Sequence, residues 1–317
     1  MTVTTADQIE AESFSEVSGR LEKNRKLSVG RAMAWIVLAI MLIITLFPLW
    51  WALRTGLSNN GALFAGDQSL GPAEFTTLNF ERVLGQATEA EIFEATGRPN
   101  SGSFDFLQSL KVSLIVATVI TAGQVLFSAM AAYAFARLTF KGRDKLFFLF
   151  LSGLMIPPIF ILIPNLILMR ELDWFNSYQG LIAPFFFMTP FAVFFLRQFF
   201  LGISKEVEEA ALLDGAGNFR TFFGIIVPMS AAPIATISIL TFVTAWNEYL
   251  WPLTVGRDPD RQPLTVALGN FTAQQPGTSP DWSGLMSATL LAALPILLIF
   301  FLFGRKVVDS IGFSGIK

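Results

Sequence analysis

The sequence predicts an all-α membrane protein with six transmembrane helices. Hydrophobic residues make up 53% of its 317 residues and charged residues only 15%, whereas soluble proteins average about 25% charged residues. The apolar residues also gather in charge-free runs, each long enough for the roughly 20 helical residues that cross a hydrocarbon core about 30 Å thick. The six predicted spans cover residues 32–53, 112–136, 146–169, 174–196, 221–247 and 282–304.

The basic residues predict the orientation of these spans. Of the 22 Lys and Arg residues, 15 lie in the four segments 1–31, 137–145, 197–220 and 304–317. Because Lys and Arg concentrate in cytoplasmic loops, these segments are placed in the cytoplasm, together with both termini.

The segments between the spans follow from this orientation. Residues 1–31 are a predicted cytoplasmic tail, and the apolar run 32–53 is too long for a typical cleaved signal peptide, so it is expected to be a retained first span. Residues 54–111 are a predicted extracytoplasmic loop without a core of its own, with a short helix around Glu89–Ala95. The membrane core then covers 112–304, includes a second extracytoplasmic loop at 251–283, and precedes a cytoplasmic tail at 305–317.

Prolines inside the apolar runs predict bent spans. Each removes a backbone donor and bends a helix, which membrane proteins tolerate where neighbouring groups satisfy the freed carbonyl. These prolines are Pro48, Pro157, Pro158, Pro164, Pro184, Pro190, Pro228, Pro233 and Pro295. The alternative is that prolines are simply common in membrane helices.

Missing residue types exclude several function classes. The chain has no Cys and no His, which excludes disulfides, the usual zinc sites and catalytic triads that use imidazole. No G-x-x-x-x-G-K-[ST] motif is present, so the chain is not expected to bind ATP through a phosphate loop of its own. The spans show no nucleophile or pair of acids of the kind that an intramembrane enzyme would need. The chain also has no basic patch that would indicate binding of nucleic acid.

A stand-alone secondary carrier is also disfavoured. No Asp, Glu, Lys or Arg lies deep in a span, although proton- and sodium-coupled carriers usually place ionisable groups there. Glu248, just beyond the end of its span, is the nearest exception. Active transport would therefore draw its energy from another protein, which requires a cytoplasmic docking surface.

A short polar segment at 202–220, on the predicted cytoplasmic side, is suited to such docking. Ser204 can cap a helix whose first turn is acidic, where the helix dipole favours negative charge. Gly215 is a typical left-handed helix end, so we expect a helix of about ten residues. Ala210 and Ala211 keep one face narrow enough for a partner's groove. A solvated loop helix without a partner is the alternative.

The residues from Glu209 to Pro228, EAALLDGAGNFRTFFGIIVP, resemble the EAA loop of ATP-binding-cassette (ABC) importer permeases. That signature reads E-A-A, three residues, Gly, nine residues, then I-x-L-P, and here only Val227 differs, in place of Leu. Other stretches resemble the carbohydrate importers of the binding-protein-dependent, maltose-permease type. They are AAYAFARLTFKGRDKL at 131–146, AWNEYLWPL at 245–253 and GNFTAQQ at 269–275.

The resemblance implies the fold of a type I ABC importer permease, in a non-catalytic, multi-pass subunit of the prokaryotic cytoplasmic (inner) membrane. The expected partners are a second homologous permease, two ATPase subunits that bind the ATP, an extracytoplasmic solute-binding protein and the lipid bilayer, with no cofactor in this chain. The helix within 202–220 would be the coupling helix that enters a cleft of the ATPase. The residues expected at this contact are Glu208, Glu209, Ala210, Ala211, Asp214, Gly215 and Arg220.

The resemblance further implies import of a sugar, for which a di- or oligosaccharide such as maltose or trehalose is expected. Aromatic faces and hydrogen-bonding side chains commonly hold sugars, although Trp and Tyr at the end of a span also act as interface anchors. The substrate-path candidates are Asn165, Trp246, Asn247, Glu248, Tyr249 and Trp251. The alternatives are an ABC permease for glycerol phosphate or polyamine and, behind them, a secondary carrier.

Overall fold

The computed structural model describes residues 29–66, 69–96, 104–273 and 280–312, and of 94–96, 272, 273 and 305–312 only the backbone. Within these ranges the protein is all helical, and its only β feature is one bridge between Ser58 and Phe75. Three helices are long and apolar enough to cross a membrane, and three bent helix pairs pass the same test together. Each of the six predicted spans therefore corresponds to one long helix or one bent pair.

The chain divides into two units, residues 1–53 and 54–317. Helix α2 (Val29–Gly56) provides the described part of the first unit. Its apolar side chains are exposed along its length, as expected of a helix whose surroundings are lipid or protein rather than water.

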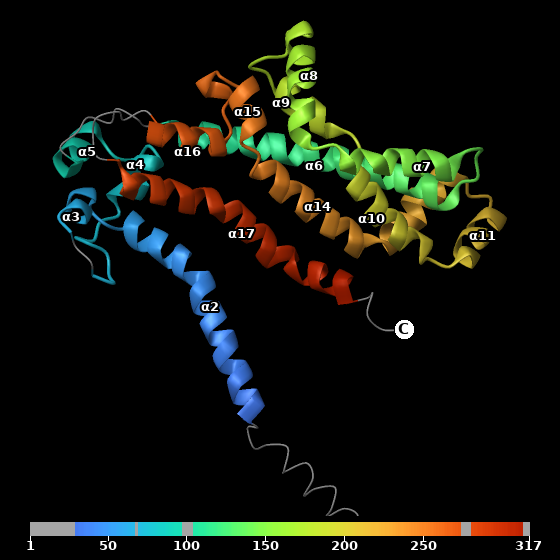
Figure 1. Ribbon diagram of the computed structural model, residues 1–317, viewed down its shortest axis with the longest axis horizontal. Coiled ribbons are helices and arrows are strands. Elements are labelled where there is room, and N and C mark those ends of the chain that lie inside the picture. Colours follow the sequence, from blue (N-terminus) through green and yellow to red (C-terminus); the bar gives the residue numbers. More distant parts are fainter. Residues whose placement is uncertain (1–28, 67–68, 97–103, 274–279, 313–317) are drawn as a thin grey trace, which may run out of the picture. The chain divides into compact units, whose positions relative to one another are not determined.

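The second unit is built around α6 (Phe106–Arg137), which begins earlier than the predicted span at 112. It packs against α9 (Tyr178–Phe186), α10 (Pro190–Leu201) and α14 (Ala231–Trp246), and α14 packs in turn against α17 (Trp282–Gly312) (Figure 1). Small residues allow this close packing, because they let helix backbones approach each other within a membrane. Buried alanines recur along α6 at helical spacing: Ala129, Ala132 and Ala136.

Three of the six spans are broken, and each break has a proline at it or within three residues of it. Helix α7 (Arg143–Ser152) with its 3₁₀ turn meets α8 (Pro158–Glu171) at 96°, and α9 meets α10 at 45°. The fifth span runs through α12 (Asn218–Thr221), a π-helix at Phe222–Ile226 and α13 (Val227–Met229) before it meets α14 at 82°. The predicted bending by proline is confirmed at the first two breaks, which directly precede Pro158 and Pro190, whereas Pro48, Pro164, Pro184 and Pro295 lie inside single helices.

The segment after α2 contains three short helices, α3 (Asn60–Phe64), α4 (Leu78–Val83) and α5 (Glu89–Thr96). The helix predicted around Glu89–Ala95 is confirmed by α5. Thr88 donates backbone and side-chain hydrogen bonds to Glu91 at its start, and these bonds lower the pKa of Glu91.

This segment is fixed to the beginning of α17. Arg82 on α4 forms an ion pair with Asp281 at 2.5 Å, and both side chains are about nine-tenths buried. Asn79 donates to the carbonyls of Gly56 and Ser58, and Ser287 on α17 also donates to Gly56. The described residues of this segment form no hydrophobic cluster by themselves, and the segment is positioned instead against the last span.

The loop 251–283 contains α15 (Leu250–Val255), a 3₁₀ turn at Pro259–Arg261 and α16 (Leu264–Ala273). Leu264, Val266 and Ala267 of α16 are buried, and Ser113 on α6 accepts a hydrogen bond from the Leu264 amide at 2.8 Å. Residues 1–28 and 313–317 of the predicted tails, and 274–279 of this loop, lie outside the described residues.

Candidate functional site

Helix α11 (Lys205–Leu213) occupies the polar segment between the fourth and fifth spans (Figure 1). Ser204 caps its N-terminus, since the Ser204 hydroxyl accepts a hydrogen bond from the Glu206 amide at 3.3 Å. Glu206 and Glu208 lie in the first turn, where negative charge complements the helix dipole. The start of this helix is therefore set by the residues that the sequence indicates.

The C-terminus of α11 closes in a Schellman motif. Gly215 has a φ of 77°, its amide donates to the Leu212 carbonyl, and the Ala216 amide donates to the Ala211 carbonyl at 2.9 Å. A left-handed conformation of this kind favours glycine, which has no Cβ. The chain therefore turns sharply after nine helical residues, and α11 ends as a short, rigid element.

The two faces of α11 differ in chemistry. On one face, Ala211 is 6% exposed and Glu208 is half-buried. On the other, Leu213 is 90% exposed, and Phe219, just beyond the turn, is 71% exposed. When a helix binds in the groove of a partner protein, exposed apolar side chains of this kind serve as its anchors.

Arg137, at the end of α6, anchors the buried face of α11. Its Nε atom lies 3.0 Å from Oε1 of Glu208. Its Nη2 atom donates to the carbonyls of Phe200 and Ile203, where α10 ends. In the other direction, Arg197 on α10 donates to the Phe135 carbonyl near the end of α6. The ends of two spans and α11 are thus joined by two guanidinium groups.

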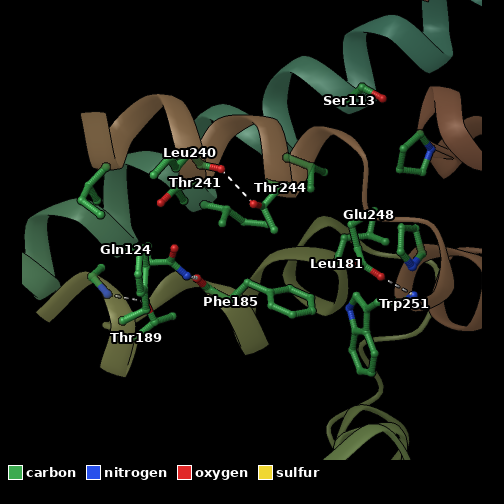
Figure 2. Close-up of a pocket in the computed structure, with 18 residues that line it drawn as sticks. Ser113, Gln124, Leu181, Phe185, Thr189, Leu240, Thr241, Thr244, Glu248 and Trp251 are labelled. Atoms are coloured by element: carbon green, nitrogen blue, oxygen red, sulfur yellow. Dashed lines mark hydrogen bonds between the residues drawn. The ribbon is translucent and has the colours of Figure 1, made fainter. Parts of the chain in front are cut away.

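A second site lies deeper in the bundle. A cavity of about 500 Å³ opens between α6, α9, α10, α14 and α15 (Figure 2), which is within the range of pockets that hold small organic molecules. Its walls are mostly apolar and aromatic, with hydroxyl, amide and carboxylate groups at intervals. The polar residues that line it are Ser113, Gln124, Thr189, Thr241, Thr244 and Glu248.

Glu248 and Trp251 form one end of this cavity (Figure 2). Oε1 of Glu248 accepts a hydrogen bond from the Trp251 amide at 3.1 Å, so the carboxylate caps α15. The Trp251 indole donates to the Gly180 carbonyl at 3.0 Å, and its ring packs edge-on against Phe185. The aromatic wall and the acid therefore have fixed positions.

Residues 124–311 match the family described as the binding-protein-dependent transport system inner membrane component. This stretch is more than half of the chain. The chain belongs to this family of inner membrane permeases.

Individual relatives agree with this assignment. The probable ABC transporter permease protein YurM of Bacillus subtilis is 30% identical, over 92% of this permease and 91% of the relative. The diacetylchitobiose uptake system permease protein NgcG of Streptomyces coelicolor is 30% identical over 88% and 87%. The sn-glycerol-3-phosphate transport system permease protein UgpE of Pectobacterium atrosepticum is 29% identical over 92% and 99%.

A solved structure shows the fold. A chain of a bacterial ABC transporter involved in the import of the acidic polysaccharide alginate superposes with a TM-score of 0.74 and 19% sequence identity. The match covers 89% of this permease and 97% of that chain. The expected ABC importer permease fold is therefore confirmed.

The residues predicted at the ATPase contact divide between the two faces of α11 and the turn after it. Glu209, Ala210, Asp214, Gly215 and Arg220 are exposed, whereas Ala211 is buried and Glu208 pairs with Arg137. Docking by the exposed residues stays a prediction.

The predicted substrate-path residues also separate in the permease. Glu248 and Trp251 line the cavity. Trp246 is 4% exposed and stacks on Phe242 in a different cluster, and the side chain of Asn247 donates to the Val243 carbonyl. Tyr249 lies against Gly269, and Asn165 lies half-buried on α8; among the residues that line the cavity, neither of these two is found.

Sequence reasoning missed the cavity residues on the other helices, Gln124, Thr241 and Thr244, and the anchor residue Arg137. Thr241 and Thr244 lie three residues apart and share a face of α14, and Glu248 follows four residues later, just beyond the end of that helix. That spacing is a signal the sequence does contain. Gln124 and Arg137 carry no comparable local signal, since their roles depend on which helices pack together.

Proposed function

We propose that this permease is one of two membrane subunits of an ATP-driven, binding-protein-dependent importer of a di- or oligosaccharide. The second subunit would be a homologous permease, two separate ATPase subunits would supply the energy, and an extracytoplasmic protein would deliver the sugar. The relative named for diacetylchitobiose supports a sugar of this size. Relatives named for sn-glycerol-3-phosphate make that smaller anionic solute the second candidate.

The observation that carries this proposal is the construction of α11. It is capped at both ends, presents Leu213 outward and is joined to the spans through Arg137. Such a helix can transmit a movement of a partner to the spans, because both of its ends are capped and its buried face is held by an ion pair. A groove of the ATPase would accept the Leu213 side chain. Closure of the ATPases would then move α11 together with the ends of α6 and α10.

The cavity lies where a passing sugar would meet both an aromatic wall and hydrogen-bonding groups. Trp251 and Phe185 offer ring surfaces, and Gln124, Thr244 and Glu248 offer polar groups. In this proposal, the cavity forms this subunit's share of the transport path. Breaks in three spans provide the bends that a change between inward-open and outward-open states requires.

Gentle extraction of the tagged permease from its native membrane tests the proposal. A second six-span permease and an ATPase should co-purify, and the complex should hydrolyse ATP faster when the loaded binding protein is added. The matching control is a permease with Leu213→Asp, which should enter the membrane but lose the ATPase. Recovery of the wild-type chain alone, under conditions that preserve other ABC importers, would contradict the proposed assembly.

A further inference from the structure

We propose that Glu248 makes the cavity selective by charge, so that the pathway through this permease accepts uncharged or cationic sugars and rejects phosphorylated or carboxylated ones. This inference rests on the proposed function and deepens it, because the relatives are named for both uncharged and anionic solutes. The proposal depends on three properties of the cavity lining: its charge, its helix ends and the free oxygen of Glu248.

The lining contains one ionisable side chain, and it is an acid. Among the described residues that line the cavity there is no Lys and no Arg. Protein sites that hold phosphate or carboxylate groups usually supply a guanidinium or ammonium group, because charge-assisted hydrogen bonds are the stronger ones. An anionic sugar would therefore meet a negative charge here without a compensating positive one.

Helix N-termini are the other common anion sites, because their free amides point at the ligand. Three helix N-termini reach this cavity, and a side chain of the permease already caps each one. Glu248 accepts from the Trp251 amide of α15, Thr189 accepts from the Ala192 amide of α10, and Ser113 accepts from the Leu264 amide of α16. These amides are thus occupied before any ligand arrives.

Glu248 retains a free acceptor for a neutral or cationic ligand. Of its two carboxylate oxygens, only Oε1 has a hydrogen-bond partner among the described residues, and no Lys or Arg of that part of the chain forms an ion pair with Glu248. The other oxygen can accept a sugar hydroxyl or the ammonium group of an amino sugar. The same carboxylate repels an anion, and the mostly apolar walls screen this repulsion less than bulk water would.

Charged thiol reagents can measure this effect without knowledge of the cargo, because the permease contains no Cys. Thr244 lies near the end of α14 and four positions before Glu248, and both residues line the cavity. Thr244→Cys would be assembled with its native partners in membrane vesicles and treated with two methanethiosulfonates, the cationic trimethylammonioethyl and the anionic sulfonatoethyl compound. The rate of reaction with each reagent would be measured from the mass increase of the permease subunit, followed over time by intact-mass spectrometry.

The permease should react faster with the cationic reagent. Glu248→Gln should lower the cation-to-anion rate ratio by roughly tenfold, since unit charges within one cavity interact strongly even where it is partly hydrated. Glu171→Gln is the matched control, because Glu171 is an exposed acid outside the cavity; it should leave the ratio unchanged. Thr241→Cys, on the same face of α14, provides a second reporter if Thr244→Cys does not assemble.

Two results would overturn the proposal: an unchanged ratio in Glu248→Gln, or no reaction of either cysteine in any nucleotide state. Neither result depends on the cargo or on uptake. Conversely, a complex that shows the expected ratio but imports no sugar would contradict the proposed function and leave the charge selectivity of the cavity in place.

Discussion

Arg137 on α6 and Glu208 on α11 form an ion pair in which the two side chains are 4% and 17% exposed. The atoms lie 3.0 Å apart, but the N–H is not aligned with the oxygen for a hydrogen bond. Charge attraction, rather than an oriented hydrogen bond, therefore holds the second span to the helix expected to meet the ATPase. Because Arg137 also binds the carbonyls at the end of α10, one side chain joins three elements.

Arg137→Ala should destabilise the permease by about 3 kcal/mol or more, because it leaves Glu208 without its partner in a mostly buried position. Thermal unfolding in detergent and limited proteolysis within 202–220 would measure the change. Arg143→Ala is the control, since Arg143 pairs with Asp144, whose side chain is 64% exposed, and solvent-exposed pairs contribute about 0–1 kcal/mol. Equal effects of the two substitutions would contradict the anchoring role of Arg137.

Gly215→Ala should weaken the turn after α11 by roughly 1–2 kcal/mol, because a side chain is disfavoured in left-handed backbone. No atom lies near enough to clash with an added Cβ, so the cost is conformational. Gly217→Ala is the matched control, since Gly217 also has open space around it and has a φ of −77°. Gly215→Trp should abolish uptake while the chain still inserts. Normal uptake by that variant would contradict docking by α11.

Leu213→Asp should prevent recovery of the ATPase with the permease and leave the unfolding temperature of the permease unchanged. Leu213 is 90% exposed, so its substitution removes little packing within the chain while it places a charge on the proposed contact. Leu70→Asp serves as the control, because Leu70 is 75% exposed in the segment predicted on the opposite side of the membrane. ATPase retention by Leu213→Asp would indicate a contact made elsewhere.

Gly123→Ala should destabilise the bundle by about 1–3 kcal/mol through overpacking. A Cβ at this position would lie 2.3 Å from the Phe186 ring and 2.7 Å from the Phe186 carbonyl, where α6 crosses α9. Gly224→Ala provides the comparison within the π-helix, since nothing lies within 4 Å of its added Cβ. The unfolding temperature of each variant in detergent measures the difference, and similar values for both would count against this close approach.

The spans and the caps of α11 could be predicted because their signals are local. Charge-free runs define the spans, and Ser204 and Gly215 define the ends of one helix whatever surrounds it. The faces of that helix could not be predicted in the same way. Glu208 and Glu209 are neighbouring acids, and successive helical residues point about 100° apart. Only the position of Arg137 decides that Glu208 faces the chain and Glu209 faces outward.

The residues that line the cavity could likewise be predicted only in part. Trp246 and Trp251 both belong to the stretch expected on the substrate path, yet α14 ends between them. Trp246 therefore packs on Phe242 of its own helix, and Trp251, on α15, closes the cavity. Gln124 comes from a different span, and its amide donates to the Phe185 carbonyl. No local pattern indicates a residue whose environment is made by a helix 61 positions later in the chain.

The pair of Arg82 and Asp281 also has a consequence for how the permease is made. These two residues lie 199 positions apart, and ribosomes add roughly 5–20 residues per second. Asp281 is therefore synthesised about 10 to 40 s after Arg82. During that interval the segment of α3 to α5 lacks both this ion pair and the hydrogen bond from Ser287 to Gly56, so its attachment to the last span forms only after α17 has begun to be synthesised.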